Sequence, residues 1–256
     1  MKIVFHKRFY NSSYAMDPAA APGRLEGIVE ILSSNSEFEF IEPAPATKED
    51  VLRAHTERHY GYVERDPLLI ELALLATGGA ILAAEEAYDG NPKFAVIRPP
   101  GHHASADSSW GFCYFNNISI SLLRLFFESK IKSAFILDFD LHTGDGNINI
   151  LSYRNDDFRV KILNPDSNDN QGYIKEVEDC MEALDEIDIF VASAGFDQGI
   201  EDWGHLLFPE NYTELGNLMK KYSEKLCNGR RYALLEGGYN HDVLPKNVYS
   251  FCKGFK

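Results

Sequence analysis

The sequence predicts one α/β domain over residues 1–256, with helices on both faces of a mostly parallel central sheet. Short runs of β-branched and aromatic residues alternate with helical patterns along the whole chain, as in doubly wound sheets. Several of these runs are almost continuously apolar, which is typical of parallel strands covered on both faces. No repeat or linker interrupts the alternation, so we expect a single three-layer domain.

The expected elements follow one another from the first residues to the last. We expect strands at residues 2–5, 38–42, 94–98, 134–139, 159–163, 187–193 and 232–235. We expect helices at residues 24–32, 67–88, 118–129, 174–184, 210–226 and 241–252. Proline is tolerated in the first turn of a helix, and Pro22, Pro67 and Pro209 stand at or just before three of these starts.

Composition excludes several classes of function. The formal net charge is −14, from 25 basic and 39 acidic residues, which repels nucleic-acid phosphates and slightly favours cationic ligands. The longest uninterrupted apolar runs are too short to span a bilayer, and the N-terminus does not resemble a signal peptide. The four cysteines form no CxxC pair, as expected for reduced thiols. We therefore expect a cytoplasmic protein with no membrane segment and no nucleic-acid partner.

Polar clusters follow four of the expected strands, at residues 98–103, 138–146, 194–197 and 236–239. Parallel sheets bind ligands at the carboxyl ends of their strands, so these clusters should meet at one edge. Residues two apart in a strand point the same way, which groups Asp138, Asp140 and His142. Together with Asp197, Asp140 and His142 supply the oxygen and nitrogen ligands of a catalytic zinc site that keeps one position for water. Each acid alone could equally be a helix cap.

Two further clusters supply groups for proton transfer and carbonyl polarisation. The adjacent His102 and His103 titrate near neutral pH, and Asp138 or Asp145 could orient their rings. Tyr239 follows two glycines, which lets the backbone turn and expose the phenol. A metal, a base and a hydrogen-bond donor together indicate metal-assisted hydrolysis of an amide. Phe112 lies just beyond the histidines and could line an entry channel.

These motifs resemble those of the histone deacetylase and acetylpolyamine amidohydrolase family. The resemblance is carried, in order, by residues 22–25, 98–104, 111–117, 138–146, 194–198 and 236–239. It implies an arginase/deacetylase-type α/β fold, one zinc ion per chain on Asp140, His142 and Asp197, and hydrolysis of N-acylated amines. It also implies a structural potassium ion held by backbone carbonyls near Asp138, Asp140 and His142.

The resemblance also implies roles for the remaining site residues. His103 would be the general base and acid, with His102 as its electrostatic neighbour. Asp138 and Asp145 would support His102 and His103 respectively. In the same comparison Tyr239 would polarise the scissile carbonyl, Phe112 would flank the acyl channel, and the Gly111 carbonyl would accept the substrate N–H.

The sequence leaves the substrate open between acetylated polyamines and acetyl-lysine peptides. Many relatives have an Asp-Pro-Leu-Gly pattern where this chain has residues 201–205, so their specificity does not carry over. Glu201 or Asp202 at the mouth could pair with a distal ammonium and favour polyamines. The compact chain would instead favour an open channel that admits bulkier substrates.

Two other functions compete with a deacetylase. An arginase- or agmatinase-like ureohydrolase has a metal motif that begins like Asp140–Thr143, but it needs a carboxylate where this chain has Gly144. It also needs a second acid two residues after Asp197, and none is present. A catalytically silent module that binds acylated amines would be expected to lack Tyr239 or His103.

Overall fold

The central sheet of the computed structural model, which describes residues 1–152 and 157–256, has the strand order β2-β1-β3-β7-β6-β4-β5. Every neighbouring pair of these strands is parallel. The strands are β1 (Lys2–Val4), β2 (Glu39–Ile41), β3 (Lys93–Ala95), β4 (Ser133–Asp138), β5 (Arg159–Leu163), β6 (Ile189–Ala194) and β7 (Arg231–Leu235). The predicted α/β class with a parallel sheet is confirmed.

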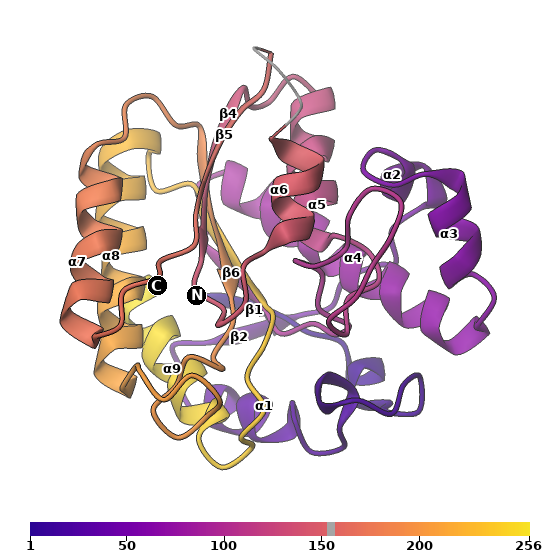
Figure 1. Ribbon diagram of the computed structural model, residues 1–256, viewed down its shortest axis with the longest axis horizontal. Coiled ribbons are helices and arrows are strands. Elements are labelled where there is room, and N and C mark those ends of the chain that lie inside the picture. The colour runs from indigo at the N-terminus through magenta and orange to yellow at the C-terminus, as the bar shows by residue number, and fades with distance from the viewer. Residues whose placement is uncertain (153–156) are drawn as a thin grey trace.

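Helices cover both faces of this sheet (Figure 1). One layer contains α1 (Glu26–Ser33), α7 (Asn170–Glu182), α8 (Pro209–Cys227) and α9 (Leu244–Phe255). The other contains α4 (Pro67–Tyr88), α5 (Asn117–Phe127) and α6 (Asp145–Leu151), with α2 (Lys48–Leu52) and α3 (Glu57–Val63) beside them. Two short 3₁₀ helices, Lys7–Tyr10 and Pro18–Ala20, lie before α1.

Local signals in the sequence explain where the long helices begin and end. Pro67 and Pro209 are the first residues of α4 and α8, where a missing N–H costs nothing. The Asp66 carboxylate caps α4 by accepting hydrogen bonds from the first-turn backbone N–H groups. Asn228 ends α8 with a φ of 55°, a left-handed conformation that asparagine tolerates.

Helix α4 is long and apolar enough to cross a membrane by length and composition, and it is the one such helix in the described ranges. Buried core helices share these properties. Most of its apolar stretch is buried, and it packs against β1, β3, β7 and α5. It therefore acts as a core element of this fold.

Among the described residues, three α-helices and the two 3₁₀ helices were not predicted. Helices α2 and α3 have few apolar residues, and their main local signals are N-terminal caps from Thr47 and Thr56. Helix α6 begins at Asp145, inside a segment interpreted as part of the site. Strand β3 also ends at Ala95, before the predicted end at residue 98.

The strand order brings the predicted polar clusters together. Strands β3, β7, β6 and β4 are successive neighbours, and each of the four clusters follows one of them. Phe139 and Phe196 pack with Phe251 of α9, at ring-centroid distances of 5.2–6.2 Å. Because side chains alternate along an extended segment, Asp140 and Asp197 face away from this aromatic core and into the site.

Candidate metal and catalytic site

Asp140, His142 and Asp197 form a compact cluster in which one ligand atom from each residue lies within 4.8 Å of the others. His142 Nδ1 lies 3.3 Å from Asp140 Oδ1 and 3.4 Å from Asp197 Oδ2. Both carboxylates are buried, whereas 40% of the His142 side chain is exposed. The structure thus brings the three predicted metal ligands together, with one side open to solvent.

The donor groups of this cluster fit a divalent cation. Backbone N–H groups hold both acids: Leu141 donates to Asp197 Oδ1 at 3.0 Å, and His142 and Gly237 donate to Asp140 Oδ1 and Oδ2, each at 2.9 Å. Asp197 Oδ2 is buried and accepts no hydrogen bond from the residues that the structure describes. A buried oxygen without a donor is costly unless a cation or proton approaches it. One nitrogen and two carboxylates with an open side match a catalytic zinc site.

The pKa values of His142 and Asp197 also show that the cluster favours a positive charge. A hydrogen bond to Asp140 raises the pKa of His142 to about 10. Burial, together with the Asp140 charge, raises the pKa of Asp197 to about 6. In the metal-free cluster a proton therefore occupies the imidazole where a cation would bind.

One of the backbone carbonyls near the predicted potassium site already accepts a hydrogen bond. The Asp138 carbonyl accepts a hydrogen bond from Asn164 Nδ2 at 3.1 Å. Potassium binding near Asp138, Asp140 and His142 stays a prediction.

The two histidines lie beside the cluster, each with its own carboxylate. His102 Nδ1 is 3.2 Å from Asp138 Oδ2, and His103 Nδ1 is 2.6 Å from Asp145 Oδ1. Although burial disfavours a charged ring, Asp140 and Asp138 hold the pKa of His102 well above its usual value. Burial and the His102 charge lower the pKa of His103 despite Asp145. His103 is therefore neutral at neutral pH and can accept a proton.

Tyr239 and Phe112 face each other across the mouth of the site. Their rings meet edge to face, with centroids 5.8 Å apart. Burial raises the pKa of Tyr239 far above its usual value, so the phenol remains a hydrogen-bond donor. Gly111 and Phe112 have φ values of 58° and 66°, and a Cβ at position 111 would collide with the His103 ring. Glycine is thus required where the chain passes His103.

Sequence reasoning missed Trp110, which covers the His103 ring. The ring centroids are 3.8 Å apart, and Trp110 Nε1 donates to Asp145 Oδ2 at 2.9 Å. The indole is 54% exposed, so it also forms part of the mouth. Its position next to Gly111 was the available signal, but the stacking depends on the left-handed turn that follows.

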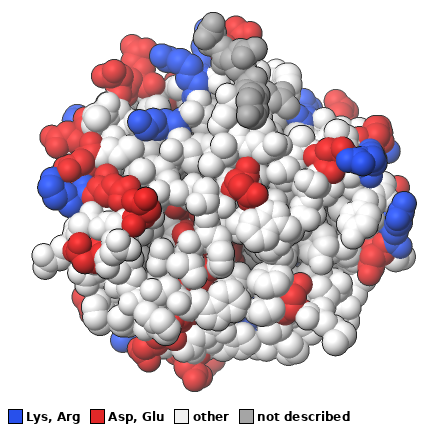
Figure 2. Space-filling model, in the orientation of Figure 1, with Lys and Arg blue, Asp and Glu red and all other residues white. Residues whose placement is uncertain are grey.

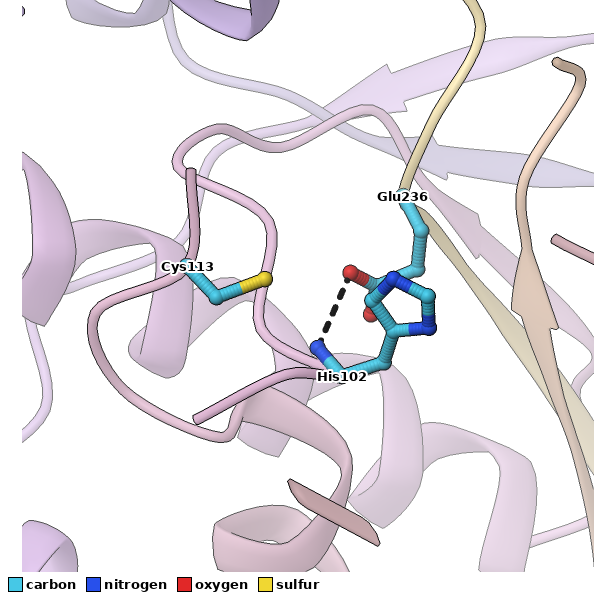
Figure 3. A group of neighbouring side chains, drawn as sticks. All are labelled: His102, Cys113 and Glu236. Atoms are coloured by element: carbon cyan, nitrogen blue, oxygen red, sulfur yellow. Dashed lines mark hydrogen bonds between the residues drawn. The ribbon is translucent and has the colours of Figure 1, made fainter. Parts of the chain in front are cut away.

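Glu236 and Cys113 form a second buried group with His102 (Figure 3). Glu236 Oε2 accepts the backbone N–H groups of Gly101 at 2.7 Å and His102 at 3.2 Å, so it holds the histidine loop. Burial raises the pKa of the Cys113 thiol well above its usual value. A protonated thiol is a poor metal ligand, which favours the Asp140 cluster as the metal centre. Sequence reasoning missed this role of Glu236.

Of the two acids that could pair with a substrate ammonium, Asp202 is not available. It is 4% exposed and accepts backbone N–H groups from Trp203, Tyr239 and Asn240. Its charge is already satisfied inside the fold. Glu201 beside it is exposed.

Charged side chains lie mainly around the edge of the face drawn in Figure 2. On this face the described Lys and Arg side chains are scattered among Asp and Glu and form no continuous patch. Nucleic-acid backbones bind to connected basic surfaces, and this face does not offer one.

Comparisons with known proteins find several deacetylase-like relatives of this chain. The family model described as the histone deacetylase domain matches residues 66–162. A protein named "Probable deacetylase" from Archaeoglobus fulgidus is 29% identical, over 95% of this chain and 82% of its own length. A second "Probable deacetylase", from Methanothermobacter thermautotrophicus, is 27% identical over 98% and 90% respectively.

The fold agrees with that of a solved structure. A crystal structure of an HDA15 HD domain superposes with a TM-score of 0.85 at 21% identity, covering 99% of this chain and 88% of that one. At this identity the likeness concerns the fold, which is the one described above. The family match and the two relatives support the predicted resemblance to the histone deacetylase family, and the solved structure shares the fold.

Proposed function

We propose that this protein is a zinc-dependent deacetylase that hydrolyses the amide of an N-acylated amine, such as an acetyl-lysine peptide or an acetylpolyamine. The observation that carries the proposal is that a neutral base, His103, lies beside the cluster of metal ligands. The His103 ring lies 5.9 Å from the His142 ring, between Asp145 and the cluster. Tyr239 follows β7 at the same edge of the sheet, two residues after Gly237, whose N–H donates to Asp140.

Asp140, His142 and Asp197 would hold the zinc ion, which when bound supplies Lewis-acid polarisation of the carbonyl and lowers the pKa of water. His103 takes a proton from the attacking water and returns it to the leaving amine. Asp145 fixes the His103 ring so that Nε2 faces the substrate. The products are a carboxylate and an amine, which takes up the proton.

Tyr239 donates a hydrogen bond to the carbonyl oxygen, where negative charge develops as water adds. One such donor contributes about 3–4 kcal/mol to the transition state. The Gly111 carbonyl would accept the substrate N–H, and Phe112 would flank the acyl chain. His102, held by Asp138, keeps a positive charge beside His103 and so favours the neutral form of that base.

A single-metal hydrolase is favoured over a ureohydrolase. Gly144 lies against Asp138 Oδ2, and even a Cβ at position 144 would collide with that oxygen. The carboxylate that a second metal would need at this position has no room without a shift of Asp138.

The test compares hydrolysis of acetylputrescine, acetylspermidine and an acetyl-lysine peptide by the zinc-loaded wild type and three variants. Tyr239→Phe should lower kcat about 10²–10³-fold, and His103→Ala about 10²–10⁴-fold. Tyr249→Phe serves as a control, because this tyrosine lies on α9 and its hydroxyl contacts Asn35 instead of the site. If the zinc-loaded wild type hydrolyses none of these amides, or releases urea from guanidino substrates instead, the proposal fails.

A further inference from the structure

The turn at residues 201–204 is attached to the segment that carries Tyr239. Asp202 Oδ2 accepts hydrogen bonds from the backbone N–H groups of Tyr239 at 2.7 Å and Asn240 at 2.9 Å. Asn240 Nδ2 returns a hydrogen bond to the Glu201 carbonyl at 2.6 Å. Charge-assisted hydrogen bonds to a buried carboxylate are among the strongest that a backbone makes. The position of the Tyr239 backbone is therefore set by Asp202.

The same turn is fixed at its other end to the metal-ligand segment. Gly204 N–H donates to the Asp197 carbonyl at 2.7 Å. The Gln198 carbonyl accepts from Leu206 at 3.1 Å and Leu207 at 2.8 Å. The turn thus connects the residue that holds the metal with the residue that would polarise the carbonyl, and it sets the spacing between them.

The aromatic ring of Tyr239 is held by the next residue of this turn. Trp203 stacks on it with a centroid distance of 4.1 Å and an interplanar angle of 29°. The other face and edge meet the Arg24 guanidinium at 5.5 Å and Phe112 at 5.8 Å. The indole also stands perpendicular to the His142 ring at 6.3 Å. It is 47% exposed and so reaches the mouth of the site.

Tyr239 needs such external support. It follows Gly237 and Gly238, and Gly238 has a φ of 112°, a region open to few residues other than glycine. Within the described ranges no hydrogen bond to protein is recorded for the Tyr239 hydroxyl, which leaves it free for substrate. A phenol on a glycine segment is placed only by what contacts its backbone and its ring.

We propose that Asp202 and Trp203 are positioning residues for the Tyr239 hydroxyl, Asp202 through the backbone and Trp203 through the ring. This inference rests on the proposed function, in which Tyr239 polarises the scissile carbonyl. It also makes Trp203, which stands in place of the Asp-Pro-Leu-Gly pattern, a wall of the substrate mouth. Because a displacement of about 1 Å in a reacting group can cost on the order of a hundredfold in rate, loss of this support should be visible in kcat.

A double-mutant cycle tests whether the two residues act through Tyr239. Trp203→Ala and Asp202→Asn should each lower kcat on the order of ten- to a hundredfold, and Trp203→Phe, which keeps a stacking ring, should restore most of it. In a Tyr239→Phe background the same changes should have almost no further effect. Glu210→Gln is the matched control, because its exposed side chain lies a few residues beyond this turn and outside the site. Full, additive losses in both backgrounds would overturn the inference.

A second measurement needs neither metal nor activity. The sequence has two tryptophans, so Trp110→Phe leaves Trp203 as the single tryptophan, which is excited selectively over the tyrosines at the red edge of the absorption band. We expect Tyr239→Leu and Asp202→Asn to increase acrylamide quenching of Trp203 in the metal-free protein, and Glu210→Gln to leave it unchanged. Unchanged quenching in both variants, with circular dichroism showing intact folds, would contradict the proposed contacts. If Asp202→Asn does not fold, the inference is tested by the double-mutant cycle of Trp203 with Tyr239 and by the quenching of Trp203 in Tyr239→Leu.

Failure of the proposed function and failure of the positioning role give different results. A wild type that hydrolyses no acylated amine contradicts the proposed function, while the fluorescence still reports whether the turn holds Tyr239. An active wild type with additive losses contradicts only the positioning role.

Discussion

The indole Nε1–H of Trp110 donates a hydrogen bond to Asp145 Oδ2 at 2.9 Å. The other oxygen of the same carboxylate lies 2.6 Å from His103 Nδ1, and the indole stacks on the His103 ring. Trp110 therefore influences the proposed base in two ways: it shares the carboxylate that supports the charged ring, and it shields the ring from water.

Both effects lower the basicity of His103, so removing them should raise it. Trp110→Ala should raise the pKa of His103 and so shift the acid limb of the kcat/KM profile to higher pH by about 0.5–1 pH unit. This shift corresponds to a hydrogen bond worth about 1 kcal/mol. A pH series of initial rates measures this shift. Trp203→Phe, on the other side of the mouth, should leave the limb in place. A downward shift in Trp110→Ala would contradict the assignment.

Metal affinity should rise with pH, because the ligands must lose protons to bind. The pKa of His142 is raised to about 10 in the metal-free cluster, so one proton leaves when zinc binds at neutral pH. The apparent affinity should therefore increase about tenfold per pH unit between about pH 7 and 9. Below pH 6 Asp197 is also protonated, and the dependence should steepen. Competition with a chromogenic chelator measures it, and a constant affinity would contradict the ligand set.

Glu236 should make stability depend on pH. Burial outweighs the charged His102 and raises the pKa of Glu236 to about 7 from 4.5. Between these values the folded protein holds a proton that the unfolded chain has lost, so this contribution is full below pH 4.5 and is lost as pH rises through about 7. The loss amounts to on the order of 3 kcal/mol in the free energy of unfolding.

The variant Glu236→Gln should remove this dependence while its amide oxygen still accepts the N–H groups of Gly101 and His102. Urea unfolding of the metal-free protein at several pH values gives the comparison, with Glu182→Gln as an exposed control. Parallel stability curves for wild type and Glu236→Gln would show that the proton is not taken up at this carboxyl.

The strands and the metal ligands could be predicted because their signals are local. Each strand is a short apolar run, and alternation along residues 138–142 already separates Asp140 and His142 from Phe139. Helices α2 and α3 escaped prediction because they are short and polar. Their stability comes from caps and from packing of α2 on α5 and of α3 on α2. Some helices and strands end at other residues than predicted. Caps and prolines end an element, and hydrophobic periodicity does not detect them.

The supporting residues of the site could not be predicted because their partners are distant in sequence. Asp202 receives hydrogen bonds from residues 37 and 38 positions further on, at Tyr239 and Asn240. Next to Trp203 and Glu201 it looks like any exposed acid of a loop. Only the folded chain shows that its carboxylate is buried and already engaged.

A methyl group at position 237 should weaken metal binding because it would displace the two carboxylate ligands. In Gly237→Ala the new Cβ would lie 2.5 Å from Asp140 Oδ2 and 2.7 Å from Asp197 Oδ2, both too close for van der Waals contact. Since Asp140 Oδ2 also accepts the Gly237 N–H, both carboxylates must move, and zinc affinity should fall about 10–100-fold, as for other changes in the supports of metal ligands.

Gly61→Ala is the matched control for this change. Nothing lies within 4 Å of a Cβ at position 61, which is in helix α3. There alanine should leave zinc affinity unchanged and stabilise the fold by about 0.5–1 kcal/mol, because glycine costs that much inside a helix. Calorimetric zinc titration and thermal unfolding of both variants separate the two effects. Equal zinc affinity in wild type and Gly237→Ala would mean that Asp140 and Asp197 do not bind the metal with these oxygens.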